Sequence, residues 1–168
     1  ILSTLPEVII AGDSTQPVYY AWLHYETEKP RRYFHSASGF GTLGYAIPAA
    51  IGAKLAMPDN PVIGLIGDGA AQFTIGEMAA AVEARLPVIF LVWNNNGYGE
   101  IKRFMEEGNI PRIGVDIYTP DFIGLVKAFG CHAVAVADID QLKTELASAV
   151  ARQLPTVIEV KQQDFITS

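Results

Sequence analysis

Apolar residues along this chain occur in short continuous runs, separated by stretches whose apolar positions repeat with helical spacing. Five runs of mostly β-branched and aromatic residues, typical of strands buried in a parallel sheet, lie at 8–11, 62–66, 88–93, 132–136 and 156–160. A weaker strand is expected at 32–35. Helices are expected at 18–25, 44–57, 75–86, 98–105, 122–129 and 139–150. This alternation predicts an α/β fold, a doubly wound six-stranded parallel sheet with helices on both faces.

Composition narrows the class of protein. With 168 residues, half of them apolar, the chain is long enough for one domain with a substantial core. The 12 basic and 18 acidic residues give a net charge of −6, which argues against a nucleic-acid or anionic membrane partner. The basic cluster at 29–32 is interpreted as a solvated loop. Cys131 is the only cysteine, which favours a reducing cytoplasm, and no apolar run reaches the roughly 20 residues that span a bilayer.

Two polar clusters each follow a predicted central strand. Gly67, Asp68 and Gly69 come after the run 62–66, and residues 94–97, Asn-Asn-Asn-Gly, come after the run 88–93. A strand, a helix and a strand of this length form a right-handed crossover, so both strands run parallel and their carboxyl ends share one edge of the sheet. Asp68 and Asn95 are therefore expected to meet.

These residues offer oxygen ligands of low total charge. Asp68 supplies a carboxylate, Asn95 an amide oxygen, and the turn at Gly97 can direct a backbone carbonyl inward. Mg²⁺ prefers such hard oxygen ligands and takes its remaining positions from phosphates and water. Gly69 and Ala70 lack bulk, so backbone N–H groups can approach an anion closely. The pattern predicts a diphosphate held through a metal that is bound by Asp68, Asn95 and Gly97.

The spacing of these clusters resembles that of a known family. Asp68 and Asn95 are 27 positions apart (95 − 68), and a glycine-rich stretch at 39–53, Gly-Phe-Gly-Thr-Leu-Gly-Tyr-Ala-Ile-Pro-Ala-Ala-Ile-Gly-Ala, lies upstream. Together they resemble the acetolactate synthase and benzoylformate decarboxylase branch of the thiamine-diphosphate-dependent enzymes. The resemblance implies that residues 1–168 are the C-terminal diphosphate-binding domain of a longer, three-domain enzyme, with thiamine diphosphate and Mg²⁺ as cofactors.

The resemblance also implies positions for the cofactor. Thr15 and Gln16 fall in a loop that holds the diphosphate, although N-capping by Ser14 or Thr15 is the alternative. Gly41 would accept a hydrogen bond from the aminopyrimidine, and Leu43 would wedge the cofactor into its bent shape. The full set of implied contacts is Thr15, Gln16, Gly41, Thr42, Leu43, Gly67, Asp68, Gly69, Ala70, Asn95, Gly97, Tyr98 and Gly99. Pro17 stands where acetolactate synthases have a histidine, which is a departure from that subgroup.

Glu100 and Ile101 fall where relatives select their substrate. A carboxylate at Glu100 suits a cationic guanidino or amino 2-oxo acid, whereas the alternative is a solvated Glu100 paired with Lys102 or Arg103. The loop at 107–118 is expected to cover the site.

The implied activity is decarboxylation of a 2-oxo acid, with or without addition of the product to a second carbonyl compound. The identity of the 2-oxo acid stays open. Partners implied by the resemblance are an N-terminal pyrimidine-binding domain, which carries an essential glutamate, and further copies in a homodimer or homotetramer. The alternative from another class is a non-catalytic phosphate- or nucleotide-binding module, but no Gly-x-Gly-x-x-Gly follows the first strand.

Overall fold

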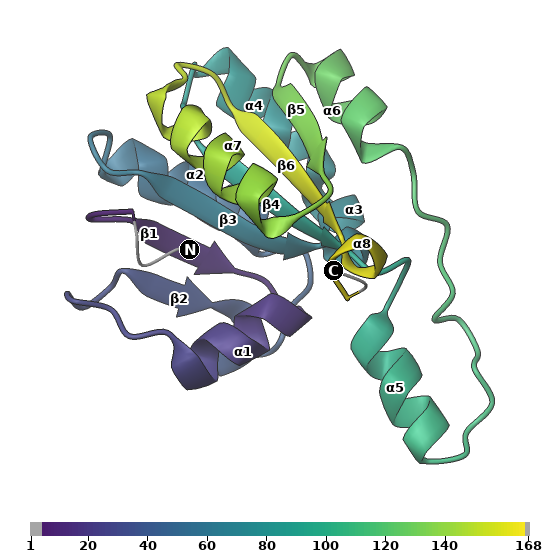
Figure 1. The fold of residues 1–168 in the computed structure, drawn as a ribbon. Helices are drawn as coiled ribbons and strands as arrows, with labels where there is room; N and C mark the ends of the chain where they lie inside the picture. Colours follow the sequence, from purple (N-terminus) through teal and green to yellow (C-terminus); the bar gives the residue numbers. More distant parts are fainter. Residues whose placement is uncertain (1–4, 167–168) are drawn as a thin grey trace.

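The computed structural model describes residues 5–166, so the predicted domain limits at residues 1 and 168 lie outside the described part of the chain (Figure 1). Strands and helices alternate along almost all of it. In chain order they are β1 (Ile9–Gly12), α1 (Gln16–His24), β2 (Tyr33–His35), the 3₁₀ helix η2 (Ser36–Ser38), α2 (Ala46–Ala56), β3 (Val62–Gly67), α3 (Asp68–Thr74), the 3₁₀ helix η3 (Ile75–Glu77), α4 (Met78–Glu83), β4 (Ile89–Asn94), α5 (Gly99–Glu107), α6 (Phe122–Phe129), β5 (His132–Val136), α7 (Ile139–Ala151), β6 (Thr156–Lys161) and α8 (Gln162–Ile166).

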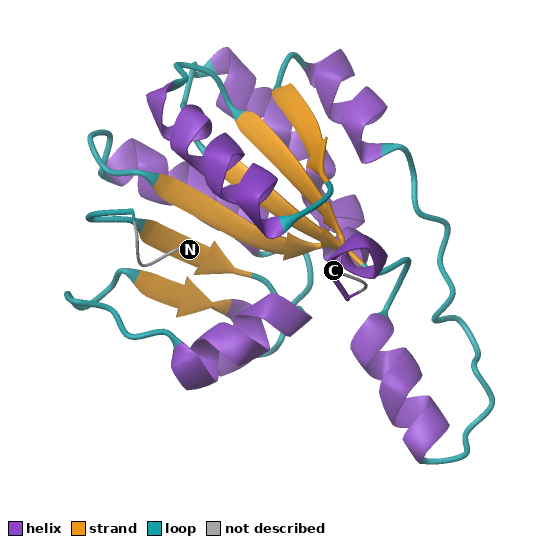
Figure 2. Ribbon diagram, viewed as in Figure 1, coloured by secondary structure: helices purple, strands orange, loops and turns teal. Residues whose placement is uncertain are grey.

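The six strands form one parallel sheet in the order β2-β1-β3-β4-β6-β5 (Figure 2). This confirms the predicted α/β fold. The chain leaves β1 toward one edge of the sheet and later returns to β3 on the other side of β1. Such a reversal leaves a crevice at the carboxyl ends of the strands, where open α/β sheets bind ligands.

Successive side chains of the central strands pack on opposite faces of the sheet. On β3, Ile63 and Leu65 belong to the core layer that includes Val18 of α1 and Leu146 of α7. Val62 and Ile66 belong to the other layer, together with residues of α2, α4 and α6. Helices therefore cover both faces of the sheet, which explains why the sequences of the central strands are continuous apolar runs.

The helix expected at 75–86 differs from the observed one. Helix α3 begins at Asp68, directly after β3, and a 3₁₀ turn separates it from α4, which ends at Glu83. Ala70 and Ala71 are buried, so the small residues after Asp68 pack α3 closely against the sheet. The break falls at Thr74, whose hydroxyl donates to the Gly44 carbonyl at 2.8 Å and ties the helix end to the glycine-rich loop. Helix α8 was not expected from the sequence.

The later helices begin and end as their sequences indicate. Asp121 caps α6 by accepting a hydrogen bond from the Gly124 N–H, and Gly130 ends that helix in the left-handed region at φ 97°. Asp138 caps α7, and the Gln141 side chain accepts in return from the Ala137 N–H. These caps confirm the helix starts predicted at Asp121 and Asp138 and the stop at Gly130.

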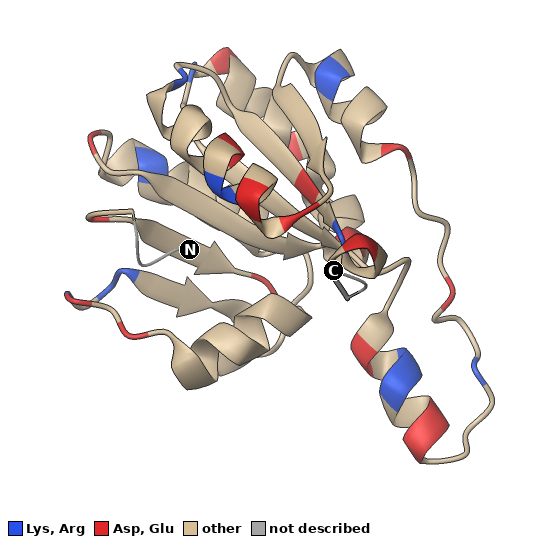
Figure 3. Cartoon of the chain, viewed as in Figure 1, with Lys and Arg blue, Asp and Glu red and all other residues tan. Residues whose placement is uncertain are grey.

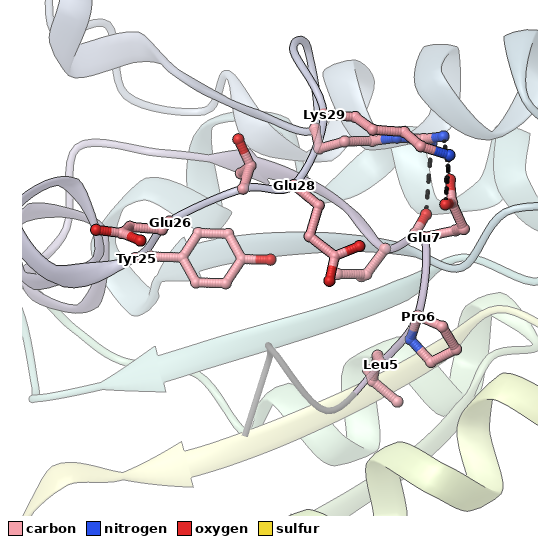
Figure 4. Close-up of a pocket in the computed structure, with 10 residues that line it drawn as sticks. Leu5, Pro6, Glu7, Tyr25, Glu26, Glu28 and Lys29 are labelled. Carbon is pink, nitrogen blue, oxygen red and sulfur yellow. Dashed lines mark hydrogen bonds and ion pairs between the residues drawn. The ribbon is translucent and has the colours of Figure 1, made fainter.

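Charged positions are spread over the elements, and acidic and basic positions alternate along α5 (Figure 3). In the basic cluster at 29–32, Lys29 and Arg32 pair with Glu7 at 2.5 and 2.6 Å. These pairs border a small pocket of about 100 Å³ before the amino ends of β1 and β2 (Figure 4). None of the described helices is both long and apolar enough to cross a membrane.

Candidate cofactor and metal site

The loops that follow β1, β3 and β4 converge on one cavity at the carboxyl edge of the sheet. Its volume is about 300 Å³. It is lined by Ser14, Thr15, Gln16, Tyr19, Gly41, Leu43, Gly67, Asp68, Gly69, Ala70, Asn95, Gly97, Tyr98, Gly99, Glu100 and Ile101. Every site residue expected from the sequence is in this lining except Thr42, while Ser14 and Tyr19 were not anticipated. The structure therefore brings residues from four separate stretches of the chain to one place.

Asp68 lies deep in this cavity as the first residue of α3, with 1% of its surface exposed. Its Oδ2 accepts hydrogen bonds from the Gly97 N–H at 2.7 Å and from the Thr119 hydroxyl at 3.2 Å. Burial raises the pKa of this carboxyl, while the hydrogen bonds from Gly97, Asn95, Gly69 and Thr119 act in the opposite direction. A cation would supply the positive charge that favours the ionised form.

Three oxygen atoms meet beside Asp68. The Asn95 amide oxygen lies 2.8 Å from the Gly97 carbonyl oxygen and 3.2 Å from Asp68 Oδ1. Half a turn of the amide would satisfy these acceptors by donation from its NH₂ group, whereas a cation would satisfy all three oxygens as they stand. Adjacent oxygens around Mg²⁺ are about 3.0 Å apart when the metal–oxygen distance is roughly 2.1 Å. The donor set therefore fits Mg²⁺ when the Asn95 oxygen faces Asp68 and the Gly97 carbonyl.

Asp13 is a buried carboxylate that sequence reasoning missed. It is fully buried, and it accepts hydrogen bonds from the backbone N–H groups of Ser14, Gly44 and Ala46 at 3.0–3.2 Å. Burial raises the pKa of Asp13, and these backbone hydrogen bonds act against the rise. Asp13 thereby fastens the loop after β1 to the glycine-rich loop before α2. The signal was present, because Gly12-Asp13 ends β1 as Gly67-Asp68 ends β3.

The loop after α5 does not cover the cavity as expected. No residue of 107–118 is in the cavity lining; the segment runs back beside α5 and supports the site from outside. The Val115 carbonyl accepts from the Tyr98 N–H at 3.2 Å, and Thr119 then reaches Asp68. Thr119 was missed in the sequence because it was interpreted only as part of a helix start.

The loop after β1 carries Thr15 and Gln16 to the cavity. Thr15 occupies the N-cap position of α1, but its side chain makes no capping hydrogen bond, so the capping alternative is wrong. The Ser14 hydroxyl instead pairs with that of Ser36 at 3.0 Å. The Gln16 amide donates to Glu100 at 2.6 Å and accepts from Trp93 at 3.3 Å. Thr15 therefore lines the cavity with a hydroxyl that does not cap the helix.

The glycine-rich loop forms another wall of the cavity. Gly41 adopts φ 66° and Gly44 φ 84°, conformations that favour glycine. Leu43 lines the cavity and also packs against the buried core. Across the cavity, a Cβ on Gly69 would meet the Tyr98 ring at 2.7 Å, so the small residue there makes room for Tyr98.

Glu100 lies at the edge of the cavity and is paired with a neighbouring cation. It lines the cavity beside Ile101, and it also pairs with Arg103 at 2.9 Å. Burial alone would raise the pKa of Glu100, but the hydrogen bonds from Arg103 and Gln16 outweigh burial and lower it. The pairing with Arg103 that the sequence suggested is therefore confirmed, and the carboxylate is ionised at the rim of the cavity.

The domain has a parallel α/β sheet with a cavity at the carboxyl ends of its strands, and oxygen ligands for a cation lie in that cavity. This combination is typical of domains that bind phosphorylated cofactors. Comparison with known proteins identifies the family. Residues 13–160 match the family described as thiamine pyrophosphate enzyme, C-terminal TPP binding domain, and the chain belongs to that family. Thiamine pyrophosphate is another name for thiamine diphosphate, so the predicted cofactor class is confirmed.

Individual relatives share the same domain. A probable 2-ketoarginine decarboxylase from Pseudomonas aeruginosa is 36% identical over 96% of this chain, and an acetolactate synthase large subunit from Escherichia coli is 32% identical over 88%. The structure of a thiamine diphosphate-dependent 4-hydroxybenzoylformate decarboxylase from Rhodococcus jostii aligns with a TM-score of 0.85 over 95% of this chain at 35% identity. The chain spans only 29%, 26% and 30% of these three proteins, respectively.

Proposed function

We propose that this domain binds thiamine diphosphate through Mg²⁺, as part of a longer acetolactate-synthase-like enzyme that decarboxylates a 2-oxo acid. Addition of the product to a second carbonyl compound is included in this proposal as a further activity of the same class. The observation that carries the proposal is the convergence of the Asp68 carboxylate, the Asn95 amide and the Gly97 carbonyl in the cavity of a domain that belongs to this cofactor-binding family. The single buried Cys131 is consistent with a cytoplasmic enzyme.

In this proposal, Asp68, Asn95 and the Gly97 carbonyl hold the metal. One carboxylate leaves a net positive charge on Mg²⁺, which is suited to bridging to a diphosphate. Thr15 and Gln16 line the same cavity beside this cluster: the Gln16 side-chain oxygen is 3.5 Å from the Asn95 amide, and the Thr15 side chain lies against Gly67. They can donate to phosphate oxygens that the metal leaves free.

The bound cofactor would supply an electron sink for the electron pair that remains when the C–C bond breaks and CO₂ leaves. The chain positions it. Gly41 presents backbone to a flat ring because it has no side chain, and Leu43 is held by the core so that it can support the bend between the two rings of the cofactor. Gly67, Gly69, Ala70, Tyr98 and Gly99 complete the wall that excludes water.

The rest of the enzyme would cover the open side of the cavity. Helix α5 extends away from the sheet, and none of its residues is buried (Figure 1). Ile101 is 48% exposed and Phe104 60% exposed on this helix. These apolar side chains fit the proposal that an N-terminal pyrimidine-binding domain, from a partner in a homodimer or homotetramer, packs here.

A second candidate concerns the substrate. Glu100 is an ionised carboxylate at the cavity rim, and a relative described as a probable 2-ketoarginine decarboxylase is 36% identical to this chain. Both observations favour a 2-oxo acid with a guanidino or amino tail, for which Glu100 would exchange its pairing with Arg103. Ile101, next to it in the lining, would contact the aliphatic part of such a tail.

Titration calorimetry on the metal-free full-length enzyme tests the main proposal. Thiamine diphosphate should bind only when Mg²⁺ is present, and NAD and FMN should not bind in this cavity. Binding of a nucleotide without a requirement for Mg²⁺ would favour the non-catalytic nucleotide-binding module instead. A panel of 2-oxo acids, assayed with the same enzyme, then identifies the substrate.

A further inference from the structure

Glu159 is a buried carboxylate outside the cavity, and the strand that carries it was interpreted from the sequence as scaffold. It lies on β6 with 4% of its surface exposed, opposite Val92 of β4. Within residues 5–166 it has no cationic side chain at ion-pair distance. A buried charge of this kind is costly unless a strong hydrogen bond offsets the lost hydration. The position therefore requires a physical reason.

That reason lies in the neighbouring strand. Asn94, the last residue of β4, donates from its Nδ2 to Glu159 Oε1 at 2.7 Å, and only 6% of Asn94 is exposed. The Asn94 Oδ1 accepts from the backbone N–H of Asn96 at 3.0 Å. One amide thus connects the Glu159 carboxylate to the backbone of the loop that carries the candidate metal ligands.

The hydrogen-bonding neighbours of Asn94 determine which way its side-chain amide faces. A carboxylate only accepts hydrogen bonds, so the Asn94 NH₂ group must face Glu159 and its oxygen must face the loop. The Asn96 N–H favours the same orientation from the other side, because it donates to the amide oxygen. Glu159 therefore reinforces the orientation in which Asn94 holds Asn96, and it fixes the NH₂ end of that amide.

The loop needs such support because its backbone is unusual. Asn96 adopts φ 59° and Gly97 φ 123°, both in the region that favours glycine. In this turn the Asn95 side-chain amide and the Gly97 carbonyl lie next to Asp68. Lys102 holds the same turn from the other side, by donating to the Asn96 carbonyl at 2.5 Å.

We propose that Glu159 is a positioning residue for the metal site, acting through the Asn94 side chain on the backbone of residues 95–97. This inference rests on the proposed function, because it assumes that those residues bind Mg²⁺. Partners that orient metal ligands from outside the coordination sphere change metal affinity roughly 10- to 100-fold when they are removed. Glu159 is not in the lining of the cofactor cavity, and its hydrogen bond to Asn94 is the contact that connects it to the loop.

The test uses the metal-free full-length enzyme with saturating thiamine diphosphate and measures the Kd for Mg²⁺ by titration calorimetry. We expect Glu159→Leu to weaken Mg²⁺ binding by roughly 10- to 100-fold. Glu159→Gln retains an acceptor for Asn94 and should recover most of the affinity. Asn94→Ala should match Glu159→Leu, and the double variant should be no weaker than either single one because both act through one path. Losses that multiply in the double variant would overturn the proposal.

A matched control separates positioning from general stability. Lys54 is also buried, at 6% exposure, and donates to the Asn60 carbonyl at 2.8 Å before the amino end of β3, far along the sheet from the metal loop. Lys54→Met should lower the melting temperature without changing the Kd for Mg²⁺. If it weakens Mg²⁺ binding as much as Glu159→Leu does, the effect of Glu159 is merely structural and the proposal is wrong.

A second measurement does not depend on the metal. Amide hydrogen exchange, followed by mass spectrometry of peptides covering residues 94–98 in the metal-free enzyme, should be faster in Glu159→Leu than in the wild type and nearly normal in Glu159→Gln. Unchanged exchange would overturn the positioning role. If exchange accelerates but the wild-type enzyme shows no dependence on Mg²⁺, the proposed function fails while the coupling from Glu159 to the loop stands.

Discussion

The side-chain amide of Asn95 lies against the carbonyl oxygen of Gly97, with 2.8 Å between the nearer amide atom and that oxygen. The same amide atom is 3.2 Å from Asp68 Oδ1. With its NH₂ group on this side, the amide donates to both acceptors; with its oxygen there, three acceptors face one another and need a positive charge between them. The proposed site thus has an amide that satisfies these oxygens without a metal and offers its own oxygen when a cation binds.

Removing the charge of Asp68 should greatly weaken Mg²⁺ binding with little effect on the fold. Asp68→Asn keeps the size of the side chain and an acceptor for the Gly97 N–H, so the buried hydrogen bond survives. We expect Mg²⁺ affinity to fall by roughly 100-fold or more, because ligand charge sets cation affinity. Titration calorimetry with thiamine diphosphate measures this. Asp140→Asn, a change at a side chain 84% exposed on α7, is the control and should change nothing.

Gly97→Ala tests whether the loop conformation matters. At φ 123° an alanine is strained, and its Cβ would lie 2.7 Å from the Val115 carbonyl oxygen, so we expect a cost of about 1–3 kcal/mol in unfolding free energy. Mg²⁺ binding should weaken as well, because moving this backbone also moves the Gly97 carbonyl oxygen, which is a proposed metal ligand. Urea denaturation and calorimetry report the two effects.

Gly52→Ala is the matched control for that substitution. Gly52 lies inside α2, and nothing stands within 4 Å of an added Cβ. Alanine is the better helix former, so this variant should gain about 0.5–1 kcal/mol and bind Mg²⁺ normally. If both variants lower the free energy of unfolding equally, the conformation of Gly97 has no particular importance for stability.

The main features of the fold and the cavity could be predicted from local sequence. Apolar runs indicated five of the six strands, and a weaker pattern at 32–35 indicated the sixth. The 27-residue spacing of Asp68 and Asn95 across one crossover placed both at the same edge of the sheet. The start of α3 at Asp68 could not be predicted in the same way. Gly-Asp-Gly is a turn sequence by itself, and only the packing of Ala70 and Ala71 beneath the sheet favours helix there.

Contacts between distant segments were the features that sequence patterns did not reveal. Thr119 reaches Asp68 across 51 positions, and Asn94 reaches Glu159 across 65. Glu159 stands within Val-Ile-Glu-Val, where a polar residue in a strand usually faces solvent. Its burial depends on the register between β4 and β6, which no local pattern specifies.

Glu100→Gln should discriminate between substrates in the full-length enzyme. If Glu100 recognises a cationic tail, the change should lower kcat/KM for a guanidino 2-oxo acid about 30-fold, or roughly 2 kcal/mol, and leave pyruvate turnover nearly unchanged. Steady-state CO₂ release measures both. Glu107→Gln removes the other carboxylate that pairs with Arg103, outside the cavity lining, and should affect neither substrate. Equal losses on both substrates after Glu100→Gln would assign Glu100 to structure alone.

Cys131 should be chemically inert in the folded protein. Burial raises the pKa of its thiol to about 11, and only 6% of the residue is exposed. The reactive thiolate is therefore scarce near pH 8, and we expect labelling by iodoacetamide to be slow in buffer and fast in urea, where the pKa returns to its ordinary value. Above pH 9 the unfolded chain loses this proton before the folded one does, so stability should decline. Fast labelling of the native protein would show that the thiol is accessible.

The 168 residues expressed alone should bind the cofactor weakly and catalyse nothing. In this enzyme class, the resemblance implies that activation of the cofactor needs a glutamate beside its pyrimidine ring, supplied by the N-terminal domain. Among the described residues, the carboxylates that line the cavity are Asp68 and Glu100. Asp68 belongs to the oxygen cluster and accepts from the Gly97 N–H, and Glu100 is held by Arg103 and Gln16. Neither is available as the missing acid–base group.

The expected loss is that of an essential general acid or base, at least ~100-fold in rate. The measurement is CO₂ release from a panel of 2-oxo acids by the 168-residue chain with Mg²⁺ and thiamine diphosphate, beside calorimetry to establish that binding persists. The full-length enzyme under the same conditions is the positive control. Turnover by the short chain that survives repurification would place the acid–base group within these residues, and Glu100 would then be the first carboxylate to replace.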